Sequence, residues 1–324
     1  MKISKFALGL SLVFLLTGCN LPFFPRKTSS SENSQLSESQ VVSSGETVSS
    51  QVASSEVVSS EDTSSTQPSS GSTTTPSYIS TSEADDVKEY YSSIDDSLTG
   101  TALLDALNKL NTKKRTRTVS YNGMKTFAAK CDADPDGSGK IIGFYDNAKI
   151  GPSWDSAKTW NREHVWPDAR GGSLVEGDAH MPRPASVKTN SDRGSKGFGK
   201  DSYDPGTYVP FYRGVASRII FYCAIANTSL KIEEIVLNSD GSTPKNTMGT
   251  LSDMLEWNLQ YLPQDTSFGA ADDLARRTEL NRNEVIQKDS QGQGNRNPFI
   301  DHPEYACKIW GNTNAKTKQI CGLN

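Results

Sequence analysis

Three histidines occur in the chain, and each lies in a polar motif and not in an apolar run. The motifs are 161–164 (NREH), 178–180 (DAH) and 301–304 (DHPE). In the first, Glu163 offers a hard oxygen ligand directly beside His164, whose imidazole can take a proton near neutral pH. This adjacency suits hydrolysis of a phosphodiester: the carboxylate holds a magnesium ion, and the imidazole deprotonates the water that attacks phosphorus.

Further polar residues could complete such a site. Asn190 can supply an amide oxygen to the metal, and the guanidinium of Arg193 has the fork of donors that matches phosphate. Arg162 and Arg296 also stand in polar motifs, and we expect phosphate contacts from arginines of this group. For each arginine a structural ion pair is an equal alternative. Because Glu-His is a common dipeptide, only the combination of these motifs predicts the chemistry.

The elements that must position these residues are mostly helices. The spacing of Leu103, Leu107 and Leu110 predicts an amphipathic helix over 101–112. Apolar spacing without internal proline predicts three more helices, at about 213–226, 247–261 and 271–287. Two short runs are typical of strands, 117–120 and 141–145. The sequence therefore predicts an α+β fold, mostly helical, with a small β element near the motifs.

The first residues have the layout of a secretory signal. Lys2 and Lys5 precede an uncharged run, 6–16, that is too short to span a bilayer. The next residues, 16–19 (LTGC), resemble the lipobox of bacterial lipoproteins, in which the cysteine is lipidated. We therefore expect residues 1–19 to be a lipoprotein signal and Cys19 to anchor the chain to the membrane by lipid. An ordinary secreted protein with an incidental Cys19 is the alternative.

The segment that follows, 20–85, differs in composition from the rest of the chain. Nearly half of its residues are Ser or Thr, and aromatic residues are scarce. Such a segment buries too little apolar surface to offset its ordering entropy, so we expect a disordered stalk, with an adhesive or glycosylated segment as the alternative. Residues 86–324 are long enough for a single domain with a hydrophobic core.

The formal net charge of −4 arises in the stalk, and the domain itself is close to neutral. Nucleic acid would therefore have to bind a local basic patch and not the bulk charge of the domain.

Four cysteines remain after Cys19, and disulfides persist outside the membrane. Cys307 with Cys321 is the first pairing to expect, because it would enclose a polar turn near the C-terminus. Cys223 lies in an apolar run and is explained as well by a buried free thiol. None of the four, Cys131 included, has the spacing of a zinc site.

The run 132–137 (DADPDG) matches the opening of a calcium loop. Gly143 stands at the twelfth position, where such a loop needs a bidentate glutamate. The sequence therefore favours an acidic turn that leads into the strand at 141.

The order of three motifs, 161–167 (NREHVWP), 178–180 and 190–193 (NSDR), closely resembles that of the endonuclease I family. The resemblance continues in 293–304 (QGNRNPFIDHPE) and covers nearly all of residues 88–311. It implies a bacterial extracytoplasmic nuclease whose active site is of the ββα-metal, or His-Me finger, type.

Position by position, the resemblance implies that His164 is the general base, that Glu163 and Asn190 bind Mg²⁺, and that nearby arginines hold the phosphate. It implies products with a 5′ phosphate. Asp178 and His180 would support these ligands from behind, although residues 181 and 182 (MP) differ from the family's usual amide and bulky aliphatic pair.

The function so implied is a sequence-nonspecific endonuclease, a monomer, that cuts extracellular DNA, with RNA as an open second substrate. A catalytically inactive, lipid-anchored surface binding protein is the alternative. Retention of Glu163, His164 and Asn190 argues against it, because a binding protein needs none of that chemistry. A zinc peptidase is disfavoured, since the chain has no His-Glu-x-x-His motif.

Overall fold

The computed structural model describes residues 84–235 and 244–324. The expected signal, Cys19 and nearly all of the expected stalk lie outside the described residues, so lipidation stays a prediction. Within the described ranges, no helix is both long enough and apolar enough to cross a membrane.

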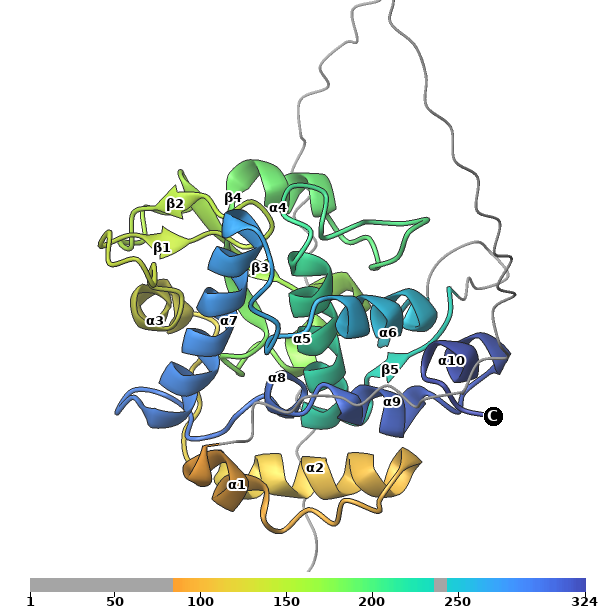
Figure 1. Ribbon diagram of the computed structural model, residues 1–324. Coiled ribbons are helices and arrows are strands. Elements are labelled where there is room, and N and C mark those ends of the chain that lie inside the picture. Colours follow the sequence, from red (N-terminus) through yellow and green to blue (C-terminus); the bar gives the residue numbers. More distant parts are fainter. Residues whose placement is uncertain (1–83, 236–243) are drawn as a thin grey trace, which may run out of the picture. The chain divides into compact units, whose positions relative to one another are not determined.

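The helix α5 (Tyr212–Ala226) lies at the centre of the fold, and almost all of its side chains are buried. Apart from Arg213, Ser217 and Arg218 its residues are apolar or aromatic, which is the pattern of a helix enclosed by other elements. Figure 1 shows it between neighbours that pack against it. These neighbours are α2 (Gly100–Lys114), α6 (Leu251–Gln260), α7 (Ala270–Lys288) and the short α8 (Pro298–Asp301).

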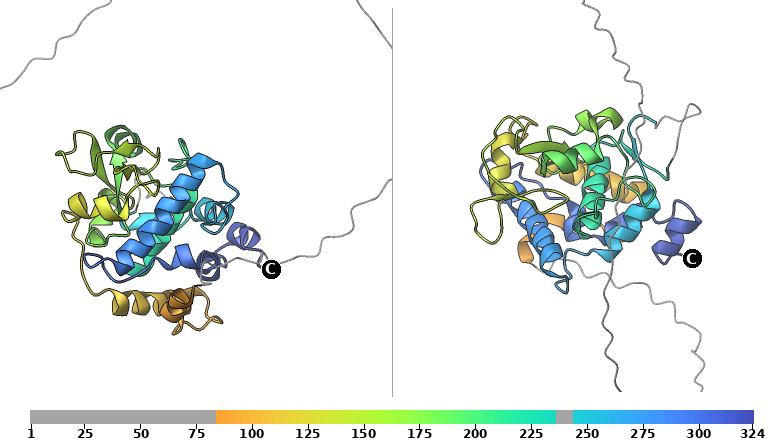
Figure 2. Two further views of the ribbon diagram at one scale, coloured as in Figure 1. Left: turned by 60° about the vertical axis from the view of Figure 1, so that its left-hand side comes forward. Right: turned by 90° about the horizontal axis from the view of Figure 1, so that it is seen from above.

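Shorter helices surround this group. They are α1 (Asp85–Tyr91), α3 (Met124–Cys131), α9 (Glu304–Trp310) and α10 (Ala315–Ile320). Figure 2 shows the C-terminal helices at the edge of the fold. The disulfide Cys307–Cys321 joins α9 to the end of α10, which confirms the expected pairing. Cys131 and Cys223 are buried free thiols.

The strands of the described residues are short and form three pairs. Two pairs are antiparallel, β1 (Ile141–Ile142) with β2 (Lys149–Ile150) and β3 (Trp160–His164) with β4 (Pro182–Ser186). The third pair, β5 (Lys231–Ile232) with β6 (Thr247–Met248), is parallel. Two 3₁₀ turns, Asp168–Arg170 and Gly172–Leu174, follow β3. This mixture of helices and small sheets confirms the α+β class.

The structure confirms the helices expected at 101–112, 213–226 and 271–287. The helix expected from 247 begins at Leu251, because residues 247 and 248 pair with β5 instead. The strand expected at 117–120 is wrong. The main chain at Thr116 and Arg117 donates to the carbonyl of Gln293, so this segment binds a loop and not a neighbouring strand.

The strand expected at 141–145 is correct only at its start. It ends at Ile142, and Tyr145 has a φ of 83°, which an extended strand does not permit. This departure turns the Tyr145 side chain toward β3, where its hydroxyl contacts Glu163.

Candidate active site

The motif 161–164 lies on β3, which is paired along its length with β4. Glu163 stands opposite Arg183, and His164 stands opposite Pro182. The helix α4 (Val187–Arg193) follows β4 without a gap and packs on both strands. Its first turn is capped by Ser186, whose hydroxyl accepts a hydrogen bond from the Thr189 amide at 3.3 Å. In Figure 1 these elements gather at one end of α5 and α7.

Alternation along β3 separates the two central residues of the motif. Side chains at successive strand positions point to opposite faces, so Arg162 and His164 share one face and Glu163 takes the other. Glu163 is only 2 % exposed, whereas His164 is partly exposed. The candidate base, His164, and the candidate metal ligand, Glu163, therefore lie on opposite faces of β3 near its end.

The carboxylate of Glu163 is held by two donors at one oxygen. The Tyr145 hydroxyl donates to Oε1 at 2.7 Å, and Nη1 of Arg193 lies 3.2 Å from the same oxygen. Burial raises the pKa of Glu163, against the opposing effects of Arg193 and Tyr145. Oε2 has no hydrogen-bond partner in the described part of the chain, so one carboxylate oxygen is available to a ligand.

Asn190 and Arg193 lie on one face of α4, since they are three positions apart. Because Arg193 reaches Glu163, this face of the helix is turned toward β3. Asn190 is partly exposed, and its side chain makes no hydrogen bond with any residue within 84–235 or 244–324. An unpaired amide thus stands on the helix face that meets the buried carboxylate.

These donors fit a hard cation such as Mg²⁺. Oxygen ligands from one carboxylate and one amide, with water completing the shell, are a common way for proteins to hold that ion. Among the described residues there is no group of three or more His, Cys, Asp or Glu side chains that could bind a metal. A site here would therefore take few ligands from the protein and leave positions for water and phosphate, as a catalytic metal requires.

Arg193 is buried, and its guanidinium is directed at the main chain. It donates to the carbonyls of His164 at 2.8 Å and Val165 at 2.6 Å, in addition to its ion pair with Glu163. This is the geometry of a residue that fixes the end of β3. A direct catalytic or phosphate role for Arg193 stays a prediction that these contacts do not favour.

His164 lies against the ring of Tyr121, with ring centroids 4.2 Å apart. Its Nε2 is 3.6 Å from a carboxylate oxygen of Glu176 and has no hydrogen-bond partner among the described residues. Burial lowers the pKa of His164, while Glu176 and Asp168 oppose the shift. The imidazole is thus held largely neutral near neutral pH, which is the state that a general base needs.

Arg162 stands beside His164 on the partly exposed face of β3. Its guanidinium lies over the rings of Tyr121, at 3.8 Å, and Trp154, at 5.0 Å. Nη1 donates to the Tyr121 carbonyl at 2.6 Å, and Nε has no partner within the residues that the structure describes. No ion pair involves Arg162 there, so it keeps donors for a phosphate.

The guanidinium of Arg296 is engaged by the protein itself. It forms a two-pronged ion pair with Asp301, at 2.7 Å on both sides, and donates to Glu284 and Gln287 at 2.6 Å. The phosphate contact expected of Arg296 stays a prediction, and these partners favour the structural alternative.

Asp178 and His180 lie in a buried polar network that precedes β4. Asp178 accepts hydrogen bonds from the Tyr222 hydroxyl at 2.7 Å and the Gln293 amide at 2.9 Å. His180 Nε2 lies 3.3 Å from the carbonyl of Asn295. Burial lowers the pKa of His180 to about 4, so it is neutral in the folded protein. The network thus joins the loop before β4 to the 293–304 segment.

The remaining two motifs have structural partners. His302 contacts Glu304 at 2.9 Å and stacks on Tyr305, at the start of α9. In the acidic run, Asp132 pairs with Arg183 and Arg282, and Asp134 pairs with Lys149 at 2.7 Å. The run is an acidic turn before β1, as the sequence favoured, and its carboxylates neutralise basic side chains.

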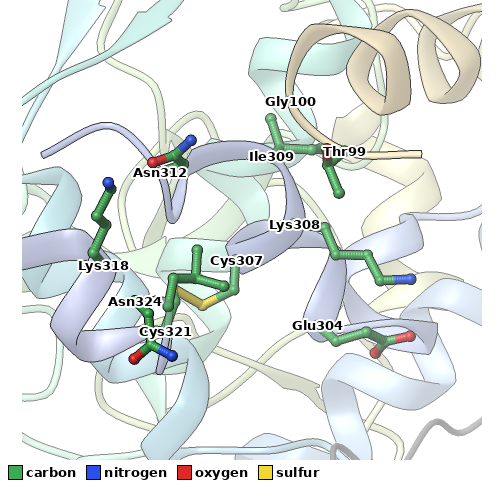
Figure 3. A pocket seen from close by; sticks show the side chains of 11 residues that line it. Thr99, Gly100, Glu304, Cys307, Lys308, Ile309, Asn312, Lys318, Cys321 and Asn324 are labelled. Atoms are coloured by element: carbon green, nitrogen blue, oxygen red, sulfur yellow. A yellow bond between two sulfur atoms is a disulfide. The ribbon is translucent and has the colours of Figure 1, made fainter. Parts of the chain in front are cut away.

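A pocket of about 600 Å³ lies elsewhere, against the disulfide between α9 and α10 (Figure 3). Thr99 and Gly100 at the start of α2, with Lys308 and Lys318, also line it. None of the site residues expected from the sequence does, so the pocket is separate from the β3–β4–α4 site.

Three residues at the site were missed by the sequence interpretation: Tyr121, Tyr145 and Glu176. Tyr121 and Glu176 lie outside the motifs, and Tyr145 was assigned only to a strand. Since contacts across the chain give these residues their roles, no local pattern could have identified them.

Known proteins are similar in sequence to the part of the chain that contains β3, β4 and α4. A family model described as "Endonuclease I" matches residues 99–210. A protein of Bacillus amyloliquefaciens named "Extracellular ribonuclease" is 33 % identical over 273 residues, which cover 74 % of this chain and 86 % of that protein. A protein of the same name from Bacillus subtilis (strain 168) is 33 % identical over 217 residues, covering 59 % and 69 %. No solved structure matches.

Proposed function

Because this chain belongs to the endonuclease I family, we propose that it is a metal-dependent endonuclease with a ββα-metal active site formed by β3, β4 and α4. Family membership supports a nuclease that acts on nucleic acid. One observation carries the finer assignment: Glu163 and Asn190 each keep an oxygen without a partner among the described residues, and the helix that carries Asn190 packs on the strand that carries Glu163 and His164.

In this proposal His164 is the general base. It takes a proton from a water molecule whose oxygen attacks phosphorus, the bond from phosphorus to the 3′ oxygen breaks, and the leaving 3′ oxygen takes a proton from solvent water. The products carry a 5′ phosphate and a 3′ hydroxyl. Glu176, 3.6 Å from Nε2, stabilises the imidazolium that forms. A positioned base contributes typically about 10²–10⁴ in rate.

Glu163 and Asn190 would hold Mg²⁺, which would supply positive charge to stabilise the developing negative charge of the reaction. Tyr145 and Arg193 fix the carboxylate from behind through Oε1, so that Oε2 faces the ligand. Asp178 and His180 secure the loop before β4. Arg162 is the arginine best placed to bind the substrate phosphate, since it is partly exposed and no ion pair involves it among the described residues.

The substrates we propose are RNA and DNA. RNA is supported by the names of both relatives, "Extracellular ribonuclease", and DNA by the general chemistry of a site that acts on the backbone. Backbone contacts carry no sequence information, so the cleavage is sequence-nonspecific. The relatives' names also support activity outside the cytoplasm, where lipidation of Cys19 would anchor this chain to the membrane. We also propose that the chain acts as a monomer.

The test is cleavage of a labelled RNA and of plasmid DNA by the purified full chain, in Mg²⁺ and in EDTA. His164→Ala is the matched variant, with its fold checked by circular dichroism. Cutting that is lost both in EDTA and in the variant supports the proposal. A folded wild-type chain that binds nucleic acid but cuts neither polymer in Mg²⁺ or Mn²⁺ would establish the alternative, an inactive binding protein.

A further inference from the structure

Tyr121 lies between two site residues that share one face of β3. The centroid of its ring is 3.8 Å from the guanidinium carbon of Arg162 and 4.2 Å from the imidazole centroid of His164. Tyr121 comes from the segment before α3, a stretch that is far from β3 in the sequence and outside every motif. No other aromatic ring of the described residues contacts the His164 imidazole.

The Tyr121 side chain is itself fixed by reciprocal hydrogen bonds to Arg162. Its hydroxyl donates to the Arg162 carbonyl at 2.8 Å, and Arg162 Nη1 donates to the Tyr121 carbonyl at 2.6 Å. The cation–π contact with the guanidinium adds a further attraction. The ring is therefore anchored independently of His164, and it offers the imidazole a stationary surface.

The imidazole needs such a surface because no hydrogen bond of its ring holds it in the described structure. Nε2 is unpaired there, and the Glu176 oxygen at 3.6 Å is beyond hydrogen-bond distance and belongs to a side chain that is 47 % exposed. Rotation about the χ2 angle of histidine is broad. The ring of Tyr121, packed against the imidazole, restricts this rotation.

We propose that Tyr121 is the positioning residue of the general base, an inference that rests on the proposed function. Its ring holds the His164 imidazole in the orientation that takes the proton, and its hydroxyl fixes the ring on β3. Tyr121 does not touch the reacting atoms. Loss of the ring therefore lowers kcat, because a misplaced base costs rate, and leaves substrate binding largely unchanged.

The experiment compares Tyr121→Leu and Tyr121→Phe in the full chain, with steady-state cleavage of a labelled RNA in Mg²⁺. Tyr261→Leu is the control, a half-buried tyrosine whose ring packs on Phe268 and Phe211. For Tyr121→Leu we expect kcat to fall on the order of 10- to 100-fold with KM changed less than about threefold. Tyr121→Phe, which keeps the ring, should recover most of the loss.

A double variant separates positioning from general stabilisation. In a His164→Ala background, Tyr121→Leu should cause no further loss of kcat, since residues that act as a unit are non-additive. A further loss equal to that in the wild type would overturn the proposal. So would a Tyr121→Leu variant that is as active as the control, or one whose loss lies in KM.

Folding and the proposed function are checked in the same series. If Tyr121→Leu does not fold, Tyr121→Met, which fills irregular space, replaces it. The histidine proton spectrum gives a readout besides activity, because the chain has three histidines and His164→Ala identifies the signal. That signal should shift in Tyr121→Leu and stay nearly in place in Tyr121→Phe. A wild-type chain that never cuts refutes the proposed function, whereas an unshifted signal refutes the positioning contact alone.

Discussion

Arg193 and Glu163 form a buried ion pair across the junction of α4 and β3, with Nη1 3.2 Å from Oε1 and both side chains almost fully enclosed. The same guanidinium donates to the main-chain carbonyl of His164. One arginine thus fixes the proposed metal ligand and the backbone of the proposed base. The pair is a structural unit of the site, and its loss should affect stability as well as activity.

We expect Arg193→Met to destabilise the protein by about 3–5 kcal/mol, because removal of one partner leaves a buried carboxylate without its counter-charge. Arg193→Lys should recover only part of this, since an ammonium cannot reproduce the fork of donors. Urea unfolding followed by circular dichroism measures both. The control is Lys188→Met, which removes an exposed ion pair on the same helix and should change the free energy of unfolding very little. If Arg193→Met and Lys188→Met lowered the free energy of unfolding equally, the structural role of the Arg193–Glu163 ion pair would be contradicted.

Tyr145→Phe should weaken the affinity for Mg²⁺, and so raise the Mg²⁺ concentration that cleavage needs, without unfolding the chain. The change removes the hydroxyl that holds Oε1 of Glu163, and such partners of metal ligands typically contribute about 10- to 100-fold in metal affinity. The measurement is the Mg²⁺ concentration that gives half-maximal cleavage. Tyr91→Phe is matched, since this buried hydroxyl donates to Asp301 at the same distance, 2.7 Å. If both variants need the same Mg²⁺ as the wild type, Tyr145 does not support a metal ligand.

His180 should make the fold less stable in mild acid. Burial lowers its pKa to about 4 from the ordinary value of 6.5 for histidine, so between these pH values the unfolded chain binds a proton that the folded chain does not. The free energy of unfolding therefore falls as the pH drops through this window, by up to roughly 3 kcal/mol. Urea unfolding at pH 7.5, 5.5 and 4.5 measures the slope. His180→Gln should have a shallower slope, and an identical slope in variant and wild type would refute this role.

Arg162 and Arg296 should respond differently to the same substitution. Arg162→Gln is expected to raise KM and to reduce the salt dependence of nucleic-acid binding, because it removes a phosphate contact. Arg296→Gln is expected to lower the free energy of unfolding by a few kcal/mol, because it leaves Asp301 buried without its ion pair. Binding titrations at several salt concentrations, together with urea unfolding, separate the two. If Arg162→Gln lowered the free energy of unfolding and Arg296→Gln raised KM, the roles of the two arginines would be the reverse of those proposed.

The sequence by itself predicted the chemistry proposed for the site and determined much of the frame. The 161–164 motif, with Asn190, predicted an adjacent base and metal ligands, and the structure places that motif on one strand beside the helix that carries Asn190. The central helix and the C-terminal disulfide were predicted from apolar spacing and from cysteine positions. These features involve residues that are close together in the sequence. The spacing of side-chain types along the sequence reflects such local contacts.

Tertiary structure alone decided which polar residues face a ligand and which hold the fold. Arg162, Arg193 and Arg296 are the same residue type in similar motifs. Their roles differ because one guanidinium lies over aromatic rings, another meets main-chain carbonyls, and the third meets carboxylates. Tyr121 and Tyr145 reach the motif from elsewhere in the chain. Such partners are set by the packing of distant segments, so the local sequence around each residue carries no record of them.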